Sequence, residues 1–485
     1  PTLAYICADE SQLLSLVTAV GNENVSVNSY CSVEPGAPYN TITGTMRLDV
    51  DGNGCDGSDA LARFVKLDVT GSDGQGSVYT NADGIYTIYT GAGDTSVSTS
   101  FENSNYFDLV LPFSHNFPLV DGSTFTQDIC LSPSGPHPDL EVVIAPISPA
   151  RPGFEAAYRI VYKNKGNQVM SSDTPAVFFN FDANHMTFLE SDTAPEQVSA
   201  GSLGWSYADL QPFESRVITI AMQVNAPTNP TFPVNVGDHL AFNSQISPIA
   251  TDDSPIDNNF DYNQTVVGSY DPNDMYCIEG DVVAPDQIGN YLHYVINFEN
   301  TGTDIAENVV VTDEILASQY DINSLQVVNS SDDVDISVDG GKVTFFFHDI
   351  KLPIGGHGNI LLKIKSNGAL AEGDSVLNNA NIFFDYNLPI ATNNAETLFQ
   401  LLGLPDQQID NAITIFPNPS HGMVNIKAAT NIQSVQVYDV QGRLLQTSLR
   451  NGNDVSVDIS SQQTGVYFLK ITSDKGIKTE RILKN

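Results

Sequence analysis

The stretch GFEAAYRIVYKNKG, residues 153–166, has a similar counterpart in GNYLHYVINFENTG, residues 289–302, at an offset of 289 − 153 = 136 positions. In both copies alternate residues are apolar or aromatic: Tyr158, Ile160 and Tyr162 in the first, and Tyr294, Ile296 and Phe298 in the second. A period of two is typical of a strand with one buried face. This internal repeat therefore predicts two tandem β-sandwiches, at residues 138–268 and 269–400.

The residues before the repeat also favour strands. Between residues 42 and 130, short β-prone runs alternate with turns rich in Gly, Asp and Asn. TNADGIY, residues 80–86, predicts a turn at Asp83 and Gly84, followed by a strand with Tyr86 and Ile88 on one face. Near the start, Asp9 precedes an apolar run that predicts a short helix. The sequence thus predicts an all-β protein of tandem β-sandwich domains with a short N-terminal helix.

The charge balance argues against two classes of partner. Lys and Arg number 20 and Asp and Glu 58, a net charge of −38 over 485 residues. Nucleic acids and anionic membrane surfaces attract dense positive charge, so we expect neither as a partner. Residues 411–485 hold eight basic and five acidic residues, a net of +3, so residues 1–410 carry −38 − 3 = −41. No apolar run approaches the roughly 18 residues of a transmembrane helix, so we do not expect the chain to span a membrane as a helix.

Five cysteines allow at most two disulfides within the chain. Cys7 and Cys31 flank one short segment and Cys55 and Cys130 bracket the next, so these are the expected pairs in an oxidising compartment. Cys277 then stays single. The alternative is five reduced, buried cysteines. No CxxC motif occurs, which leaves zinc sites and thioredoxin-type chemistry without support.

DVDGNGCDGSD, residues 49–59, places oxygen-bearing side chains at alternate positions with glycines between them. Alternate carboxylates converge on a hard cation in EF-hand-like loops. We therefore expect calcium here, and the expected ligands are Asp49, Asp51, Asn53, the carbonyl of Cys55, and Asp59 or Asp56. Ala60 stands where an EF-hand has glutamate, so an acidic turn without metal is the alternative.

Catalytic signatures are missing from the sequence. AGSLG around Ser202 lacks the first glycine of GxSxG, and the eight histidines form no HExxH motif. A glycosidase needs only two carboxylates, and 58 acidic residues make such a pair unidentifiable from sequence. We predict no catalysis by these residues.

Other conspicuous residues have structural interpretations. Trp205 lies in a strand-like context, which favours core packing over an exposed glycan platform. Asp271, Asn273 and Asp274 could bind a second calcium, but such a phrase is more often a turn whose side chains cap backbone groups. Four histidines are expected to be satisfied by their neighbours: His185, His293, His348 and His357.

Residues 413–485 form a chemically distinct end of the chain. The phrases ITIFPNPS, VQVYDVQGRLL, DIS and GVYFLKI follow in order, and together they predict a compact sandwich of about seven strands. Every phrase resembles the type A C-terminal sorting domain of the Bacteroidetes type IX secretion system. The residues that carry this resemblance are Pro417, Asn418, Pro419, Gly422, Tyr438, Asp439, Gly442, Arg443, Gly465, Tyr467 and Lys470.

The resemblance implies a route of export. A domain of this kind implies passage through the periplasm and an outer-membrane translocon, then transfer to a carrier β-barrel. A sortase-like peptidase would remove the domain by cleavage in the linker 401–412. The mature protein would be anchored to lipopolysaccharide or released, so we expect a secreted protein on the outer face of the outer membrane or in the medium.

Two further resemblances concern the front of the chain. Residues 31–137, with the T-x-x-x-G-x-Y hairpin at 80–86, resemble the prealbumin-like or Cna-B sandwich of bacterial surface proteins. The repeats 138–268 and 269–400 resemble Ig-like conserved-repeat domains of such proteins. ICADE, residues 6–10, resembles the segment that follows leucine-rich repeats, so residues 1–30 are expected to be the helical remnant of an upstream region with a functional head.

These resemblances imply a non-catalytic surface protein in which the sandwiches form a rigid stalk. Two alternatives remain open. One is an adhesin whose sandwiches bind glycan or a surface protein directly, and the other is the non-catalytic tail of a secreted hydrolase.

Overall fold

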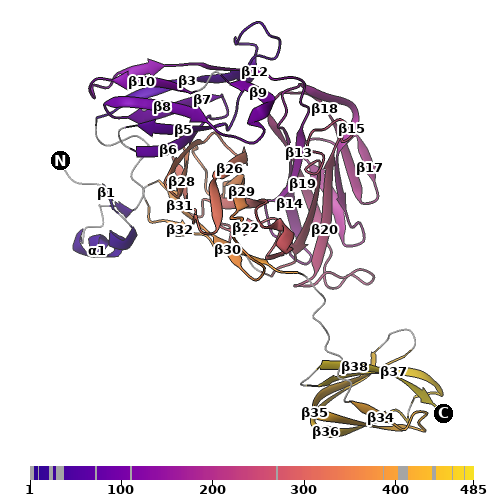
Figure 1. Ribbon diagram of the computed structural model, residues 1–485. Coiled ribbons are helices and arrows are strands. Elements are labelled where there is room, and N and C mark those ends of the chain that lie inside the picture. The colour runs from indigo at the N-terminus through magenta and orange to yellow at the C-terminus, as the bar shows by residue number, and fades with distance from the viewer. Residues whose placement is uncertain are drawn as a thin grey trace. The chain divides into compact units, whose positions relative to one another are not determined.

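The computed structural model describes residues 5–8, 10–20, 26–28, 38–71, 74–109, 112–268, 271–385, 387–401, 413–439, 444–460, 462–473 and 476–485 (Figure 1). Strands account for 57% of the described residues and helix for 3%, which confirms the all-β prediction. The chain forms two compact units, Pro1–Leu401 and Leu402–Asn485. Within the described part of the chain, no helix is both long enough and apolar enough to cross a membrane.

The short helix lies near the start of the front unit. β1 (Tyr5–Cys7) is followed by α1 (Glu10–Val20) and β2 (Ser26–Asn28), and β1 pairs in parallel with β2. Parallel neighbours need a crossover connection, and α1 lies in it. The N-terminal helix is confirmed, whereas the origin of this segment in a leucine-rich-repeat region stays a prediction.

The first sandwich of the front unit has two sheets. One is built around β3 (Asn40–Leu48), which pairs with β4, β7, β11 and β12, and β9 lies beyond β12; the other runs β10-β8-β5-β6. The remaining bounds are β4 (Ala60–Leu61), β5 (Lys66–Gly71), β6 (Gly74–Tyr79), β7 (Ile85–Thr90), β8 (Gly93–Thr99), β9 (Phe107–Leu109), β10 (Phe113–Phe117), β11 (Thr124–Thr126) and β12 (Ile129–Pro133). At the predicted turn Gly84 has a φ of 68°, and Tyr86 and Ile88 are buried.

The second sandwich pairs the sheets β13-β14-β19-β16 and β17-β18-β15-β20-β21. Its strands are β13 (Leu140–Pro146), β14 (Glu155–Asn164), β15 (Met170–Phe181), β16 (Met186–Ser191), β17 (Gln197–Ser199), β18 (Ser202–Leu210), β19 (Ser215–Val224), β20 (His239–Ile246) and β21 (Asn259–Thr265).

The third sandwich contains the sheet β22-β24-β29-β26, the short sheet β23-β33-β30, and the run β27-β28-β25-β31-β32. Its strands are β22 (Met275–Cys277), β23 (Val282–Val283), β24 (Tyr291–Glu299), β25 (Val309–Glu314), β26 (Tyr320–Ser330), β27 (Asp335–Asp339), β28 (Lys342–Phe347), β29 (His357–Ser366), β30 (Ser375–Asn378), β31 (Ala380–Phe384), β32 (Ile390–Ala391) and β33 (Ala395–Phe399).

The two copies of the internal repeat also make matching hydrogen bonds. Asn164 accepts a bond from the backbone N–H two residues on, and its Nδ2 donates to the carbonyl of Leu210 at 2.9 Å. Asn300 in the second copy also accepts from the N–H two residues on, and its Nδ2 donates to the carbonyl of Leu352 at 2.9 Å. The Asn-x-Gly phrase therefore closes the same turn in both sandwiches, because a buried asparagine satisfies backbone groups on each side of it.

The three sandwiches close on one another. β6 of the first pairs antiparallel with β27 of the third, with Val78 opposite Ser337 and Gly76 opposite Asp339. This seam creates a nine-stranded sheet, β10-β8-β5-β6-β27-β28-β25-β31-β32 (Figure 1). The first and third sandwiches are therefore in contact, which three sandwiches joined end to end would not be; the role of a stalk stays a prediction. β6 and β27 would otherwise be edge strands, and each satisfies the free backbone groups of the other.

At each contact between two sandwiches, a side chain of one is also buried in the core of the other. Tyr79 at the end of β6 is buried in the core of the third sandwich, and its hydroxyl donates to the carbonyl of Leu325 at 2.8 Å. Phe213 of the second sandwich joins the core of the first, with its ring centroid 4.9 Å from that of Phe107. Leu361 of the third belongs to the core of the second. The three sandwiches thus share buried apolar surface.

A buried ion network lies where the three sandwiches meet. Lys363 on β29 pairs with Glu102 of the first sandwich at 2.7 Å and with Glu141 of the second at 2.5 Å. Burial works to raise the pKa of Glu141, but Lys363, Lys165 and His293 together outweigh it and lower that pKa. Removing one partner would leave a buried charge uncompensated, so these pairs specify how the sandwiches sit against one another.

The rear unit is a small β-domain with five strands among its described residues, where about seven short strands were predicted. They are β34 (Thr414–Phe416), β35 (Met423–Tyr438), β36 (Leu444–Asp458), β37 (Gly465–Ser473) and β38 (Gly476–Lys484), ordered β34-β35-β37-β38 with β36 on β35. The pairing of β35 with β36 shifts register around Ile432. Such irregularities bend a strand, so a long strand such as β35 can change direction without ending.

Candidate functional site

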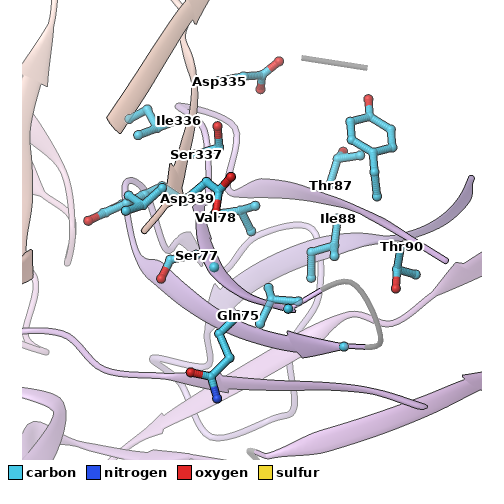
Figure 2. Close-up of a pocket in the computed structure, with 17 residues that line it drawn as sticks. Gln75, Ser77, Val78, Thr87, Ile88, Thr90, Asp335, Ile336, Ser337 and Asp339 are labelled. Carbon is cyan, nitrogen blue, oxygen red and sulfur yellow. The ribbon is translucent and has the colours of Figure 1, made fainter. Parts of the chain in front are cut away.

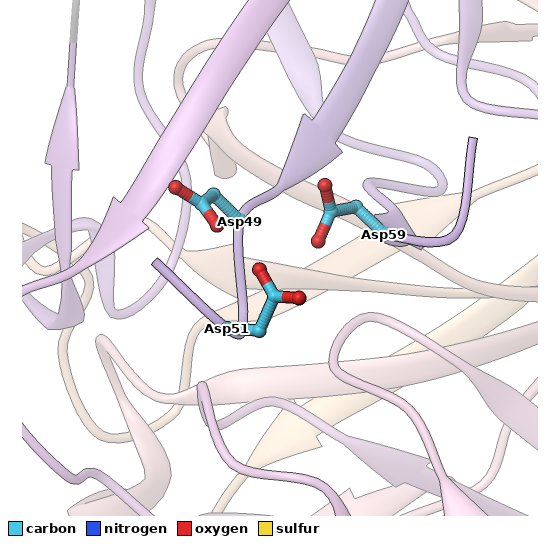
Figure 3. A group of neighbouring side chains, drawn as sticks. All are labelled: Asp49, Asp51 and Asp59. Atoms are coloured by element: carbon cyan, nitrogen blue, oxygen red, sulfur yellow. The ribbon is translucent and has the colours of Figure 1, made fainter. Parts of the chain in front are cut away.

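The acidic loop of the first sandwich connects the end of β3 to β4. The carboxylates of Asp49, Asp51 and Asp59 offer oxygen atoms that lie within 4.8 Å of one another (Figure 3). Asp49 and Asp59 are buried at the base of the loop and Asp51 is exposed. The structure therefore brings together three of the side chains that the sequence predicted as calcium ligands, and offers a hard cation an oxygen-only site.

Backbone N–H groups preorganise this acidic loop. Asp49 accepts from the N–H groups of Gly52 at 2.8 Å, Asn53 at 3.1 Å and Gly54 at 2.9 Å. Gly52 and Gly54 adopt φ values of 76° and 96°, a conformation that glycine reaches without strain. The Asn53 side chain turns its Nδ2 to Asp51 Oδ2 at 2.8 Å, so its nitrogen and not its oxygen faces that carboxylate.

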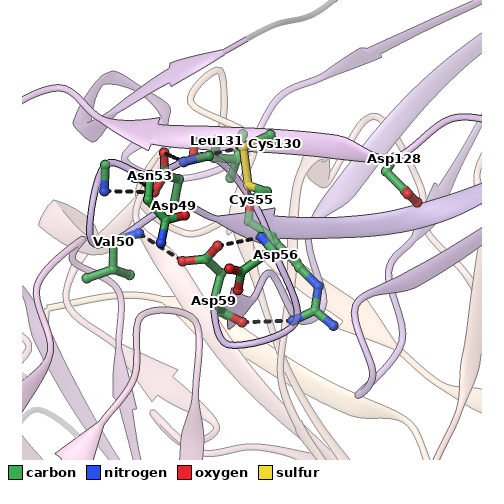
Figure 4. Close-up of a disulfide and its surroundings, with 12 residues drawn as sticks. Asp49, Val50, Asn53, Cys55, Asp56, Asp59, Asp128, Cys130 and Leu131 are labelled. Carbon is green, nitrogen blue, oxygen red and sulfur yellow. Dashed lines mark hydrogen bonds between the residues drawn. A yellow bond between two sulfur atoms is a disulfide. The ribbon is translucent and has the colours of Figure 1, made fainter.

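A disulfide ties the acidic loop to the opposite strand. Cys55 is bonded to Cys130 on β12, beside the bonds of Asp49 and Asp59 (Figure 4). Arg47 adds a bond from Nη1 to the backbone carbonyl of Asp59 at 2.8 Å. The loop is therefore held at its middle and at its C-terminal end. Cys31 of the other expected pair lies outside the described residues.

The remaining cysteine lies in a chain of polar contacts without a reactive geometry. Cys277 is buried, and its Sγ donates to Glu279 Oε2 at 3.2 Å, while Glu279 Oε1 lies 2.6 Å from His293 Nδ1. The carboxylate thus stands between the thiol and the imidazole. Burial, reinforced by Glu279, raises the pKa of Cys277, whereas a nucleophilic cysteine needs a lowered pKa.

The other residues singled out in the sequence have structural partners. Trp205 is buried and its Nε1 donates to the carbonyl of Thr193 at 2.9 Å, so it offers no exposed platform. Asp271 and Asn273 accept bonds from backbone N–H groups, and Asp274 accepts from Asn297 Nδ2 at 2.9 Å. Each of the four histidines lies within 4.0 Å of an acid: His185 of Asp182, His293 of Glu279, His348 of Asp335 and His357 of Glu299.

Sequence reasoning missed a pocket at the seam between the first and third sandwiches. It has a volume of about 420 Å³ (Figure 2). Gln75 and Ser77 come from β6, Thr87 from β7, and Asp335 and Ser337 from β27. The walls exist only because β6 and β27 pair, and no local pattern indicates that pairing.

Several predicted sorting residues of the rear unit act inside its fold. Asn418, between Pro417 and Pro419, donates to the carbonyl of Arg481 at 2.7 Å and accepts from the N–H of Leu483 at 2.9 Å, which fastens the entry to β38. A Cβ on Gly422 would lie 2.1 Å from Ser460 Oγ. Tyr467 is buried and donates to the carbonyl of Gln463. Tyr438, Gly465 and Lys470 lie on β35 and β37, Asp439 follows β35, and Gly442 and Arg443 lie outside the described residues.

Comparisons with known proteins identify the rear unit. Residues 414–485 match the family model described as "Secretion system C-terminal sorting domain". Residues 271–398, which form the third sandwich, match a domain of unknown function, DUF7619. No curated protein matches the chain significantly.

Solved structures with some similarity include surface and pilin proteins. The BSP domain of a biofilm-associated protein is 10% identical over 71% of this chain and 81% of that chain, with a TM-score of 0.24. The major pilin subunit of Bacillus cereus is 9% identical over 92% and 93%, with a TM-score of 0.15. A DUF3823 family protein from Bacteroides ovatus is 16% identical over 47% and 97%, with a TM-score of 0.18. TM-scores this low carry no argument about function.

The rear unit determines the localisation of the protein. Its sorting domain belongs to the type IX secretion system, so the protein is exported to the cell surface or secreted. The finer resemblances, to type A sorting domains, Cna-B sandwiches and Ig-like repeats, stay predictions.

Proposed function

We propose that this chain is a non-catalytic surface protein with a closed three-sandwich body and a removable export signal. The match of residues 414–485 to a sorting domain carries the proposal. The boundary between the two compact units, at 401 and 402, supports it, because a cut there separates two folded bodies. A carrier β-barrel would receive the protein from the translocon, and a sortase-like peptidase would cut within residues 401–412. The product would be anchored to lipopolysaccharide or released.

Peptide mapping by mass spectrometry tests this processing. The protein is recovered from the native cell surface and from the medium, in cells with and without the sorting peptidase. We expect peptides beyond residue 412 to be missing from normal cells and kept in the peptidase mutant. Heterogeneous, cell-bound product would indicate a lipopolysaccharide anchor, and a homogeneous product in the medium would indicate release. An intact C-terminus in both strains would contradict removal.

The outer face of β37 and β38 is our proposed contact with the export machinery. Phe468 and Leu483 are 36% and 39% exposed there, and Arg481 lies directly opposite Phe468. Exposed apolar residues beside a positive charge are typical of a protein contact surface. Phe468→Asp should therefore reduce surface display while the chain still folds. Thr414→Asp, at an exposed position on the other edge of the sheet, is the control, and equal display of both variants would refute this surface.

The acidic loop is our proposed calcium site. Asp49, Asp51 and Asp59 would supply carboxylates and Cys55 its carbonyl, while Asn53 would contribute only after its amide turns. The close approach of three carboxylates supports the proposal, since a divalent cation would relieve their repulsion. EDTA should lower the melting temperature of the wild type more than that of Asp51→Asn. Asp83→Asn, in an exposed turn, is the control, and no EDTA shift in the wild type would sink the claim.

An adhesin is the second candidate, and the seam pocket favours it. The pocket combines hydroxyl, amide and carboxylate groups, such as Ser77, Gln75 and Asp335, with apolar walls, which suits a polar ligand such as a glycan. Glycan-array binding by the purified protein, lost in Gln75→Ala, would favour the adhesin over a purely structural body. Absence of binding across the array would remove this candidate.

A further inference from the structure

A second group of acids lies at the joint between the first and second sandwiches. Asp139 directly precedes β13, where the chain enters the second sandwich, and Asp252 and Asp257 lie in the connection from β20 to β21. Oxygen atoms of these three carboxylates lie within 4.8 Å of one another. Asn103 of the first sandwich donates its Nδ2 to Asp139 Oδ2 at 2.6 Å, so the group touches both sandwiches.

Three oxygen atoms at this joint are buried without a hydrogen-bond partner. They are Asp139 Oδ1, Asp257 Oδ1 and Asn258 Oδ1. The side chains of Asp139 and Asn258 are completely buried, and Asn258 Nδ2 donates to Asp252 Oδ2 at 3.1 Å, which places its amide at the acids. An unpartnered buried oxygen is costly, and three of them beside an acidic group point to a ligand that accepts their lone pairs.

Acidic side chains outnumber basic ones at this joint. The buried network and the acid group together contain five carboxylates against four basic side chains, 4 − 5 = −1: Glu102, Asp139, Glu141, Asp252 and Asp257 against Arg63, Lys163, Lys165 and Lys363. Lys165 contacts Asp257 and lies 3.7 Å from Asp139 Oδ1. A bound cation would neutralise the surplus negative charge.

We propose that Asp139, Asp257 and Asn258, together with Asp252, bind a calcium ion that fastens the first sandwich to the second. The donors are oxygens from carboxylates and an amide, which hard cations prefer, and the group contains no histidine or cysteine that would favour zinc. Lys165 lies 3.4 Å from Glu102 and keeps that partner when the ion neutralises the aspartates. Asn103 anchors Asp139 from the first sandwich, so the ion stabilises the joint and not one sandwich alone.

The number of bound calcium ions tests this proposal. The full chain is dialysed against calcium and the bound metal is counted by mass spectrometry, for the wild type, Asp257→Asn, Asp51→Asn and the double variant. We expect one ion fewer in Asp257→Asn, whether or not the acidic loop at 49–59 binds an ion. Asp253→Asn is the matched control, because Asp253 faces His137 at 2.6 Å and keeps the group intact. An unchanged count in Asp257→Asn overturns the proposal.

Two further readouts guard against a folding defect and separate the two sites. Circular dichroism must show that Asp257→Asn keeps its sheet content, and Asn258→Ala, which retains all three carboxylates, should raise the dissociation constant of this ion at least tenfold. Hydrogen exchange at residues 101–106 and 137–142 should speed up on calcium removal in Asp51→Asn, where only the joint site remains. Calcium-independent exchange in that variant would refute the joint site. If the acidic loop at 49–59 binds no calcium, the proposal for the joint site is unaffected.

Discussion

Tyr79 offers a sharp test of the closed three-sandwich body. It is 4% exposed, lies in the core of the third sandwich and donates to Leu325, although it belongs to β6 of the first. A buried aromatic side chain covers about 150–250 Å², worth roughly 4–6 kcal/mol at about 25 cal/mol per Å². Aromatic-to-alanine changes in cores cost about 3–5 kcal/mol. We therefore expect Tyr79→Ala to lower the free energy of unfolding by about 3–5 kcal/mol, and Tyr79→Phe by about 1 kcal/mol.

Urea unfolding of the full chain, followed by circular dichroism, measures these losses. Val198→Ala is the control, because Val198 is 64% exposed and its truncation should change the free energy by less than about 0.5 kcal/mol. Hydrogen exchange should also accelerate in Asp335–Asp339 on β27, far along the chain from the substitution. In a linear stalk Tyr79 would face solvent. A loss below about 1 kcal/mol in Tyr79→Ala, with unchanged exchange in β27, would refute the shared core.

Three further substitutions test other parts of the front unit. Replacing Cys55 and Cys130 by serine removes a cross-link over 75 residues and should cost about 2–5 kcal/mol by chemical denaturation; an unchanged midpoint would contradict the cross-link. Gly44→Ala would place a Cβ 1.9 Å from the carbonyl oxygen of Gln127, so we expect a loss of about 1–3 kcal/mol in the same assay, and wild-type stability would refute that close approach. Burial raises the pKa of Asp313 from 3.8 to about 7, so its contribution to stability is present below pH 4 and lost as the pH rises through 7. Asp313→Asn should therefore flatten this decline and be more stable than the wild type at pH 8 by about 2–4 kcal/mol, whereas parallel pH profiles would show that Asp313 does not cause it.

Local patterns were enough to predict the elements and the acidic loop. The alternation in Tyr158, Ile160 and Tyr162 reports burial of one strand face, and all three side chains are buried. The acidic loop lies within 11 successive residues, so chain geometry alone brings Asp49 and Asp59 close. Such features need no knowledge of how separate sandwiches meet.

The pairing of the first sandwich with the third and the acid group at Asp139 could not be predicted from the sequence, and the physical reason is the same for both. β6 has the sequence GQGSVY, whose glycines carry no hydrophobic period, and its partner β27 follows far along the chain. Asp139 and Asp257 have no motif spacing and meet only after the second sandwich folds. Contacts between edge strands and between distant loops depend on tertiary packing, which a single sequence does not display.

The described cores of the two units use separate residues, and this matters for removal of the export signal. The buried cores of the front unit draw on residues between Ile42 and Phe399, and the core of the rear unit begins at Ile413. Cleavage within 401–412 would therefore expose the core of neither unit. Separating the sandwiches would instead uncover Tyr79 and Phe213, which lie in the cores of their neighbours. A body closed in this way can lose its signal outside the cell without loosening, whereas a string of independent sandwiches would present a protease with linkers at every joint.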